Sequence, residues 1–184
     1  NLWALRQNSC FKNWGFAANK TADNHIVNTS PTYDIAIIGA GPAGATCALA
    51  LRGSGLRVAL LDKAEFPRDK VCGDAIPARC EKVLRQLDPA YADALKNFAE
   101  KVEIAACRVV APSLEQFDYA FHTRGYCSAR LDFDHFLLGL ALQDDALDFY
   151  PGQAVNSIKD AAGMWQLTTA DQVLQARAIV GCDG

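Results

Sequence analysis

A chain of 184 residues is long enough for one well-packed core and too short for two large domains. Its hydrophobic share of 51% and charged share of 21% are typical of a globular protein. A net charge of −3, without a run of lysine or arginine, gives no sign of a nucleic-acid-binding surface. No apolar stretch approaches the ~20 residues of a membrane span. We therefore expect a cytoplasmic protein, with peripheral membrane contact as an open alternative.

The cysteines and histidines do not follow the spacing of a metal site. No two cysteines form a C-x-x-C pair, and the histidines lie far apart. We expect no metal, no disulfide framework, a reducing compartment and no catalytic histidine. The residues concerned are Cys10, Cys47, Cys72, Cys80, Cys107, Cys127 and Cys182, with His25, His122 and His135.

The first 31 residues share no pattern with the rest of the chain. They predict a disordered leader or an upstream segment, and residues 32–184 then form a nucleotide-binding domain. An aromatic anchor built from Trp3, Phe11, Trp14 and Phe16 is the alternative for this segment.

The most informative stretch begins with the apolar run Tyr33–Ile38, which predicts a buried parallel strand. It leads into Gly-Ala-Gly-Pro-Ala-Gly, the G-x-G-x-x-G spacing of dinucleotide-binding turns. Gly39 permits the tight turn, Gly41 lets the backbone approach a pyrophosphate, and Gly44 lets the next helix lie close to the strand. The amides at the start of that helix form an anion site.

The helix is expected to pass Arg52 and to end at Gly53 or Gly55. A second strand, 57–61, ends in Asp62, which follows Gly44 by 18 positions. An acid at this place accepts hydrogen bonds from the adenosine ribose and repels the 2′-phosphate of NADP. The motif alone does not separate FAD from NAD, and a plain structural turn with a solvated Asp62 is the alternative.

The remaining sequence predicts a mixture of helices and strands rather than a plain repeat. The fold class is therefore α/β, a parallel nucleotide-binding sheet with added antiparallel strands. Because nothing follows to cover the last strand, we expect a domain that is incomplete at its C-terminus. The expected elements are a charged loop at 63–74, a helix from Pro77 with Val83, Leu84 and Leu87 inward, a helix from Asp88-Pro89 with Leu95 and Phe98 inward, strands at 102–111, 116–121 and 125–131, a helix capped by Asp132 and running through Leu142, a strand at 147–150, a hairpin of 164–169 and 172–177, and a buried strand at 178–180.

Four separated blocks resemble the FAD-dependent geranylgeranyl reductase family, within the p-hydroxybenzoate hydroxylase-like flavoproteins. They are Gly39–Gly44 with Asp62, Phe66–Asp74, Arg130 with Phe133-Asp134, and Gly181–Gly184. The resemblance covers about residues 33–184. It implies an FAD domain of glutathione reductase type and reduction of isoprenoid double bonds, in prenyl chains of chlorophyll or membrane lipids. The flavin would be reduced by NAD(P)H or ferredoxin.

The resemblance also implies a set of cofactor-binding residues. Ala43 and Gly44 would face the pyrophosphate, Asp62 the ribose and Ala154 the adenine half. Cys72, Gly73 and Ala75 would line the flavin side, Arg130 would bind the cofactor, and Asp183 would act near the phosphates through structure or water. The full set is Gly39, Gly41, Pro42, Ala43, Gly44, Asp62, Lys63, Cys72, Gly73, Ala75, Arg130, Ala154 and Asp183. The family's later glycine-aspartate flavin motif and its aromatic-rich prenyl-pocket segment are absent.

Two of these residues have a second interpretation. Arg130 is either a bidentate phosphate ligand or a surface charge at a strand end. Cys72 is either a proton donor or redox thiol, with its pKa lowered by Arg68 and Lys70, or a small residue required beside the flavin. Arg68 and Lys70 themselves are expected to be solvated loop charges.

The function that this pattern predicts is hydride delivery from reduced flavin N5 to an alkene of a small or prenyl-lipid substrate, with a proton from the other side. A flavin monooxygenase or halogenase is the first alternative. Halogenases usually carry Gly-Glu-Ser where this chain has Cys72-Gly73-Asp74. The second alternative is an inactive nucleotide-binding fragment.

Overall fold

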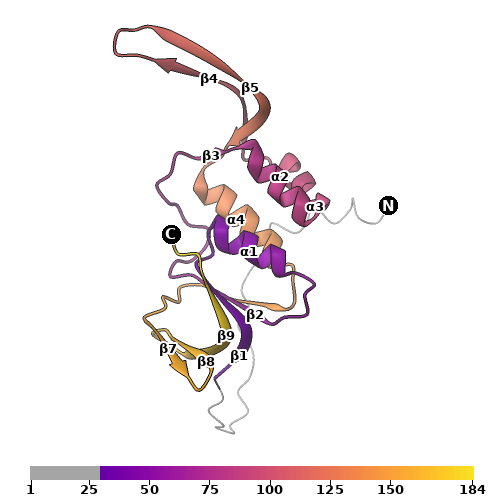
Figure 1. Ribbon diagram of the computed structural model, residues 1–184, viewed down its shortest axis with the longest axis vertical. Coiled ribbons are helices and arrows are strands. Elements are labelled where there is room, and N and C mark those ends of the chain that lie inside the picture. The colour runs from indigo at the N-terminus through magenta and orange to yellow at the C-terminus, as the bar shows by residue number, and fades with distance from the viewer. Residues whose placement is uncertain (1–29) are drawn as a thin grey trace.

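The computed structural model describes residues 30–184 (Figure 1). The predicted leader and its aromatic alternative fall almost wholly on residues 1–29 and lie outside the described residues. The elements in chain order are β1 (Thr32–Ile38), α1 (Pro42–Leu51), β2 (Val58–Leu61), β3 (Ala75–Ile76), α2 (Ala78–Leu87), α3 (Pro89–Asn97), β4 (Val102–Val110), β5 (Gln116–Cys127), α4 (Arg130–Ala141), β6 (Leu147–Tyr150), β7 (Ser157–Ala161), β8 (Met164–Thr168) and β9 (Val173–Gly181).

A six-stranded sheet in the order β6-β2-β1-β9-β8-β7 forms the base of the molecule. Its first four strands are parallel, and β7, β8 and β9 pair antiparallel. Helices α1 and α4 lie together over one face of this sheet (Figure 1). The predicted α/β fold, a parallel sheet with antiparallel additions, is therefore confirmed.

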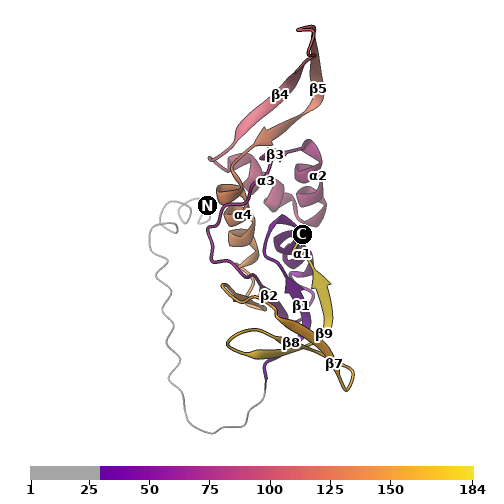
Figure 2. The same cartoon turned by 90° about the vertical axis from the view of Figure 1, so that its left-hand side faces the viewer.

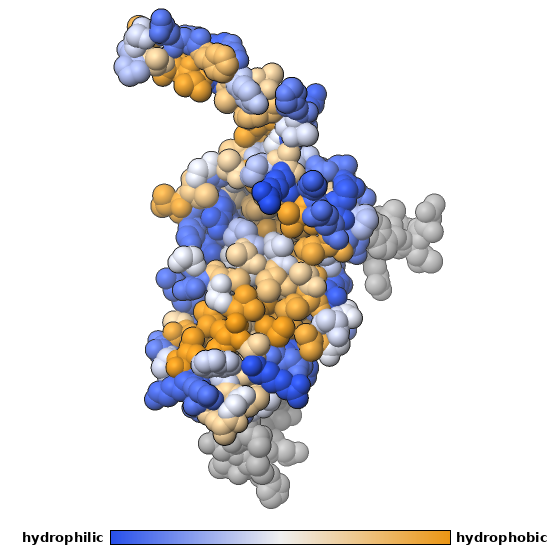
Figure 3. Space-filling model, in the orientation of Figure 1, coloured by the Kyte–Doolittle hydropathy of each residue, from blue (hydrophilic) through white to orange (hydrophobic). Residues whose placement is uncertain are grey.

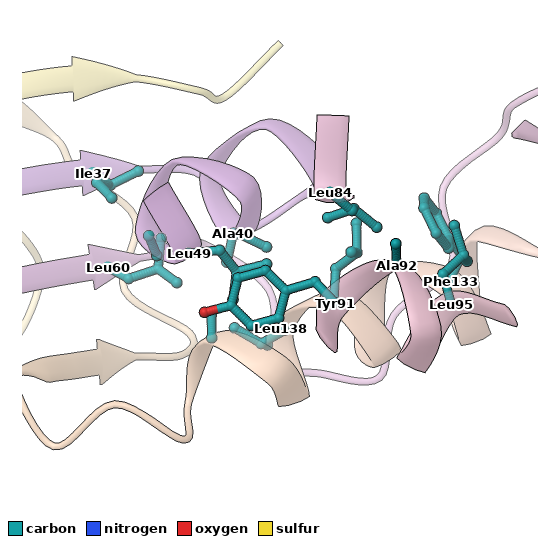
Figure 4. Packing of buried hydrophobic residues seen from close by; sticks show 14 of the residues in the cluster. Ile37, Ala40, Leu49, Leu60, Leu84, Tyr91, Ala92, Leu95, Phe133 and Leu138 are labelled. Carbon is teal, nitrogen blue, oxygen red and sulfur yellow. The ribbon is translucent and has the colours of Figure 1, made fainter. Parts of the chain in front are cut away.

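The core forms where apolar strand residues meet the helices. Ile37 of β1 and Leu60 of β2 are fully buried and are register partners, and they belong to one apolar cluster with Leu49 of α1 and Leu138 of α4 (Figure 4). Burying side chains of this size contributes roughly 1.5–3 kcal/mol each. The cluster holds the start of α1 at the carboxyl ends of the strands.

The same core continues into the second helical pair. Leu84, Tyr91, Leu95 and Phe133 lie in it, which confirms the predicted inward position of Leu84 and Leu95 (Figure 4). Phe98 is partly buried against the same cluster. The prediction for two further residues of α2 was wrong, because Val83 and Leu87 are 36% and 38% exposed. Of the three apolar residues, only Leu84 is fully covered, so the buried face of α2 is narrower than the pattern predicted.

Helix α4 begins three residues earlier than predicted. Its N-cap is Ala129 and not Asp132, because the Asp132 and Phe133 amides already donate to the Ala129 carbonyl, at 3.1 and 3.0 Å. Asp132 lies instead in the first turn, where its charge favours the helix dipole. The earlier start makes Arg130 a helical residue.

Strand β5 is longer than predicted and forms an arm with β4. The expected third strand at 125–131 does not exist: Gly125–Cys127 completes β5, and Arg130 and Leu131 belong to α4. No turn-forming residue interrupts the chain before Gly125, so pairing with β4 continues across a register shift. Figures 1 and 2 show the β4–β5 arm projecting from the body, and Figure 3 shows apolar and hydrophilic residues side by side on it.

Strand β9 unites two predicted segments. The hairpin strand and the strand at 178–180 are one element, paired antiparallel with β8 and parallel with β1. The prediction that 178–180 is buried was wrong, since Ala178 is exposed and Ile179 and Val180 are only partly buried. Its pairing with β8 stops at Ala176, so the outer edge of β9 is open from there on. Strands β3 and β7 were not predicted.

Candidate dinucleotide-binding site

The glycine turn between β1 and α1 depends on contacts that only glycine permits. Gly39 has φ +100°, and a methyl group on it would lie 2.5 Å from the Cys182 carbonyl oxygen. A methyl group on Gly44 would overlap the Gly39 carbonyl oxygen and lie 2.9 Å from its carbon. These contacts bring α1 directly against β1 and agree with the tasks predicted for both glycines.

Gly41 faces two arginine side chains. A methyl group on Gly41 would lie 3.3 Å from Arg68 Nη2 and 3.8 Å from Arg130 Nη2. Pro42 and Ala43, the first residues of α1, flank this position, and no residue of the turn places a side-chain cap on the helix amides. An anion that lies over Gly41 therefore meets the α1 N-terminus and two guanidinium groups at once.

Both arginines are held by Asp134, which is 0% exposed. Arg130 donates from Nε and Nη2 to the two carboxylate oxygens at 2.6 and 2.7 Å, and Arg68 donates from Nη1 at 3.0 Å. The carboxylate raises the pKa of Arg130. One carboxylate for two guanidinium groups leaves a net positive charge beside the glycine turn.

This cluster overturns two interpretations of the sequence. The Arg68 side chain is 17% exposed and ion-paired, so it is not a solvated loop charge. The Arg130 side chain is 15% exposed within a helix, so it is not a strand-end surface charge. The role of Asp134 was missed. Its sequence signal was an acid four residues after Arg130 on the apolar side of a helix, between Phe133 and Leu137.

Cys72 lies on the same loop as Arg68 and is exposed. The pKa of its thiol is lowered, chiefly by the nearby Asp74 backbone amide and by the Arg130 guanidinium group. The predicted lowering of this pKa is therefore present, but Arg68 and Lys70 do not cause it. Gly73 and Ala75 are exposed neighbours in the same segment. Arg130 therefore connects the thiol to the arginine cluster.

Asp62 ends β2 and is 8% exposed. Its Oδ2 accepts from the Ala40 amide at 2.8 Å and its Oδ1 from the Ala64 amide at 2.9 Å. Asp62 thus braces the glycine turn, and the alternative of a solvated Asp62 is wrong. Each carboxylate oxygen keeps acceptor capacity for a ribose hydroxyl.

The segment after β6 runs alongside Asp62. The Gln153 amide donates to the Asp62 carbonyl at 2.8 Å, and this places the exposed Ala154 near the predicted adenosine end. Lys63, which follows Asp62, is also exposed.

The last residues of the chain form the other wall of the turn. The Cys182 amide donates to the Ile38 carbonyl at 2.7 Å, and the Asp183 nitrogen lies 2.8 Å from the position of a methyl group on Gly39. A methyl group on Gly184 would lie 3.1 Å from Lys70 Nζ. The structure therefore brings the strand ends of β1, β2 and β9 together with the 63–74 loop.

Among residues 30–184, no cluster of three histidine, cysteine, aspartate or glutamate side chains has the geometry of a metal site. His122 and His135 are exposed. No helix of the described segment is both long and apolar enough to cross a membrane.

A glycine turn at the start of a helix, an acid at the end of the second parallel strand and cations over the turn define a dinucleotide-binding domain of Rossmann type. The residues fit the ADP half of a dinucleotide: the space over Gly41 is bordered by donors, and the Asp62 carboxylate lies beside the Ala40 amide of the same turn.

Residues 34–73 match the family described as FAD dependent oxidoreductase. Over 159 residues the chain is 29% identical to a geranylgeranyl diphosphate reductase of Rhodobacter capsulatus, covering 83% of this chain and 37% of that protein. Over 128 residues it is 29% identical to a 1H-pyrrole-2-carbonyl-[peptidyl-carrier protein] brominase of Pseudoalteromonas luteoviolacea, covering 70% and 30%. A solved flavoprotein/dehydrogenase from Cytophaga hutchinsonii superposes with a TM-score of 0.72 at 26% identity, covering 83% and 39%.

These similarities relate the chain to FAD-dependent flavoproteins, and its fold is of the same type. It spans less than two-fifths of the length of each of the three proteins just named.

Proposed function

We propose that the chain forms the FAD-binding part of an FAD-dependent oxidoreductase of geranylgeranyl reductase type. The observation that carries this proposal is the convergence of Gly41, Arg68 and the start of α1 on one space, with the Asp62 carboxylate on the adjoining Ala40 amide. A diphosphate in that space would receive backbone and guanidinium hydrogen bonds together. The similarity to the Rhodobacter capsulatus reductase, over 83% of this chain, supports the reductase type.

The chain's own residues would bind and orient the cofactor. The helix amides and Arg68 hold the diphosphate, and Asp62 holds the ribose and disfavours NADP at this site. Bound FAD would supply hydride transfer to an isoprenoid double bond. Cys72, an exposed thiol whose pKa is lowered by the Asp74 backbone amide and the Arg130 side chain, would hold or give up a proton at its sulfur. NAD(P)H or ferredoxin would reduce the flavin, and a prenyl lipid in a cytoplasmic, peripherally membrane-bound setting would be the substrate.

A flavin-dependent halogenase or monooxygenase is the second candidate. The similarity to the Pseudoalteromonas luteoviolacea brominase favours it, because that match covers 70% of this chain. The Cys72-Gly73-Asp74 sequence weighs against it, since a thiol stands where halogenases usually carry glycine. An inactive nucleotide-binding fragment is the third candidate.

The first test is the visible spectrum of the purified chain. Flavin bands that correspond to one FAD per chain, or saturable uptake of added FAD, are expected. A colourless protein that also takes up no added FAD contradicts the proposal and supports the inactive fragment.

The second test separates the two enzymatic candidates. Turnover of geranylgeranyl diphosphate with dithionite-reduced FAD is measured with and without oxygen. A reductase works anaerobically, whereas a halogenase or monooxygenase requires oxygen. Strictly oxygen-dependent product formation would reject the reductase type.

A further inference from the structure

We propose that Asp134 is a positioning residue for a nucleoside diphosphate: it sets the direction of two guanidinium groups toward the phosphates and touches no ligand atom itself. This inference rests on the proposed function, because it takes the glycine turn to be the place where an ADP half binds. It assigns the specificity for the diphosphate to a fully buried carboxylate on α4 rather than to the glycine turn alone.

The two arginines are hydrogen-bonded to Asp134 in different ways. Arg130 uses both Nε and Nη2 on Asp134, in a bidentate pair that fixes the plane of its guanidinium group. Arg68 uses only Nη1, at 3.0 Å. Within residues 30–184 no acceptor is hydrogen-bonded to Arg68 Nη2, which lies 3.3 Å from the position of a methyl group on Gly41. Asp134 thus holds Arg68 by one nitrogen and leaves the other directed over the turn.

Burial explains why this arrangement is rigid. A carboxylate with 0% exposure is stable only if it is fully paired, so both arginines are required to stay on it. Arg68 comes from the 63–74 loop, which has no helix or strand of its own to fix the side chain. Without Asp134, the two like-charged groups would repel each other and Arg68 would turn toward solvent.

The charge balance favours an anion. Within the cluster, the two guanidinium groups and one carboxylate leave one positive charge, and the α1 N-terminus adds its partial positive charge. The Asp62 carboxylate lies outside the cluster, on the Ala40 amide. The negative charge of a diphosphate is attracted by this excess positive charge, whereas adenosine without phosphates has no charge for it to attract. The cluster therefore distinguishes ligands by their phosphates and not by their base or sugar.

The experiment compares ADP, AMP and adenosine on the 184-residue chain by NMR chemical-shift titration, which also measures millimolar affinities. The wild-type chain is expected to bind ADP more tightly than adenosine. In Asp134→Asn this ADP-to-adenosine ratio is expected to fall by roughly 10- to 100-fold, the range for loss of a charge-assisted hydrogen bond, with adenosine affinity unchanged. Asp132→Asn, which removes an acid from the same helix outside the cluster, is the matched control and keeps the ratio.

A second variant covers the case in which Asp134→Asn does not fold. Arg68→Lys retains the charge on an outer loop but lacks the planar group that bonds Asp134 and a phosphate together. Its ADP-to-adenosine ratio is expected to fall at least 10-fold, whereas a wild-type ratio would show that charge alone suffices and would overturn the inference. An equal loss of ADP and adenosine affinity in Asp134→Asn would assign Asp134 a purely structural role and would also overturn it.

The wild-type chain separates the inference from the proposed function. Binding of ADP and adenosine with equal affinity would overturn the role of Asp134 and leave a nucleotide site. Binding of none of the three ligands, nor of FAD, would overturn the proposed function together with the inference.

Discussion

Replacement of Gly44 by alanine gives the sharpest test of how α1 lies on β1. The added methyl group would overlap the Gly39 carbonyl oxygen and lie 2.9 Å from its carbon and 3.3 Å from Ile37 Cγ2. Because the overlapped atoms belong to the backbone, no side-chain rotation relieves the clash. Helix α1 must move away from the sheet, and Leu49 then loses contact with Ile37 and Leu60. Overpacking alone costs about 1–3 kcal/mol, and opening this core brings the expected loss to about 3 kcal/mol or more.

The assay is urea unfolding of the wild-type chain, Gly44→Ala and Gly139→Ala. Gly139 is the matched control: it lies exposed within α4, and a methyl group on it would have no neighbour within 4 Å. Alanine there should stabilise the chain by roughly 0.5–1 kcal/mol, since glycine inside a helix is unfavourable by that amount. A Gly44→Ala midpoint equal to that of the wild type would refute the close approach of helix and strand.

Asp62→Asn, which loses its charge next to the Ala40 amide, should bind FAD roughly tenfold more weakly by equilibrium dialysis; unchanged binding would count against the ribose role. Because the thiol pKa of Cys72 is lowered, its alkylation by iodoacetamide, followed by mass spectrometry, should reach half-maximal rate below the ~8.5 of a free cysteine. Arg130→Gln should raise that midpoint, and a wild-type midpoint at or above that of a cysteine peptide would contradict the Arg130 contact. Tyr33 is buried and hydrogen-bonded to Asp148 and Tyr150, and its pKa is raised in the folded state. Above pH 10 the unfolded state therefore releases the proton first, and the wild type should lose stability more steeply than Tyr33→Phe, by up to about 1.4 kcal/mol per pH unit; equal slopes would reject the raised pKa. Replacement of 106–120 by a two-residue turn should change the free energy of unfolding by less than about 1 kcal/mol, because these arm residues are almost all exposed; a larger loss would show that the arm packs on the body.

The glycine turn and its flanking strand were predictable because their signals are local. The lack of room at Gly44 comes from Gly39 and Ile37, which lie within seven residues, whereas the atoms that crowd Gly39 belong to the distant Cys182 and Asp183. The acid at Asp62 was predictable for the same reason, since strand length fixes its place. Its hydrogen bond to the Ala40 amide, across 22 residues, was not.

The arginine cluster was not predictable in detail because its members come from separate elements. Arg68 lies 66 residues from Asp134, and nothing near Arg68 in the sequence indicates that its loop packs on α4. The start of α4 was also misplaced, since Asp132 is a favourable N-cap residue and Ala129 is not. The start at Arg130 places Arg130 and Asp134 on one helical face, where they form an ion pair.

The exposure of 178–180 shows a different limit of sequence reasoning. Apolar residues predict burial, but burial depends on which strand lies alongside, and β8 ends its pairing at Ala176. Ala178 and Ile179 therefore have β1 on one side only. The apolar pattern alone therefore predicts that a strand forms, but not which strands lie beside it.

The contact between Cys182 and the turn at Gly39 joins positions more than 140 residues apart. The glycine turn is therefore complete only when β9 has paired with β1. A nucleotide that binds only the folded chain raises its free energy of unfolding by RT ln(1 + [L]/Kd), where [L] is the free nucleotide concentration. The amount of cofactor that a preparation binds would then also measure the fraction of chains in which β9 is correctly paired.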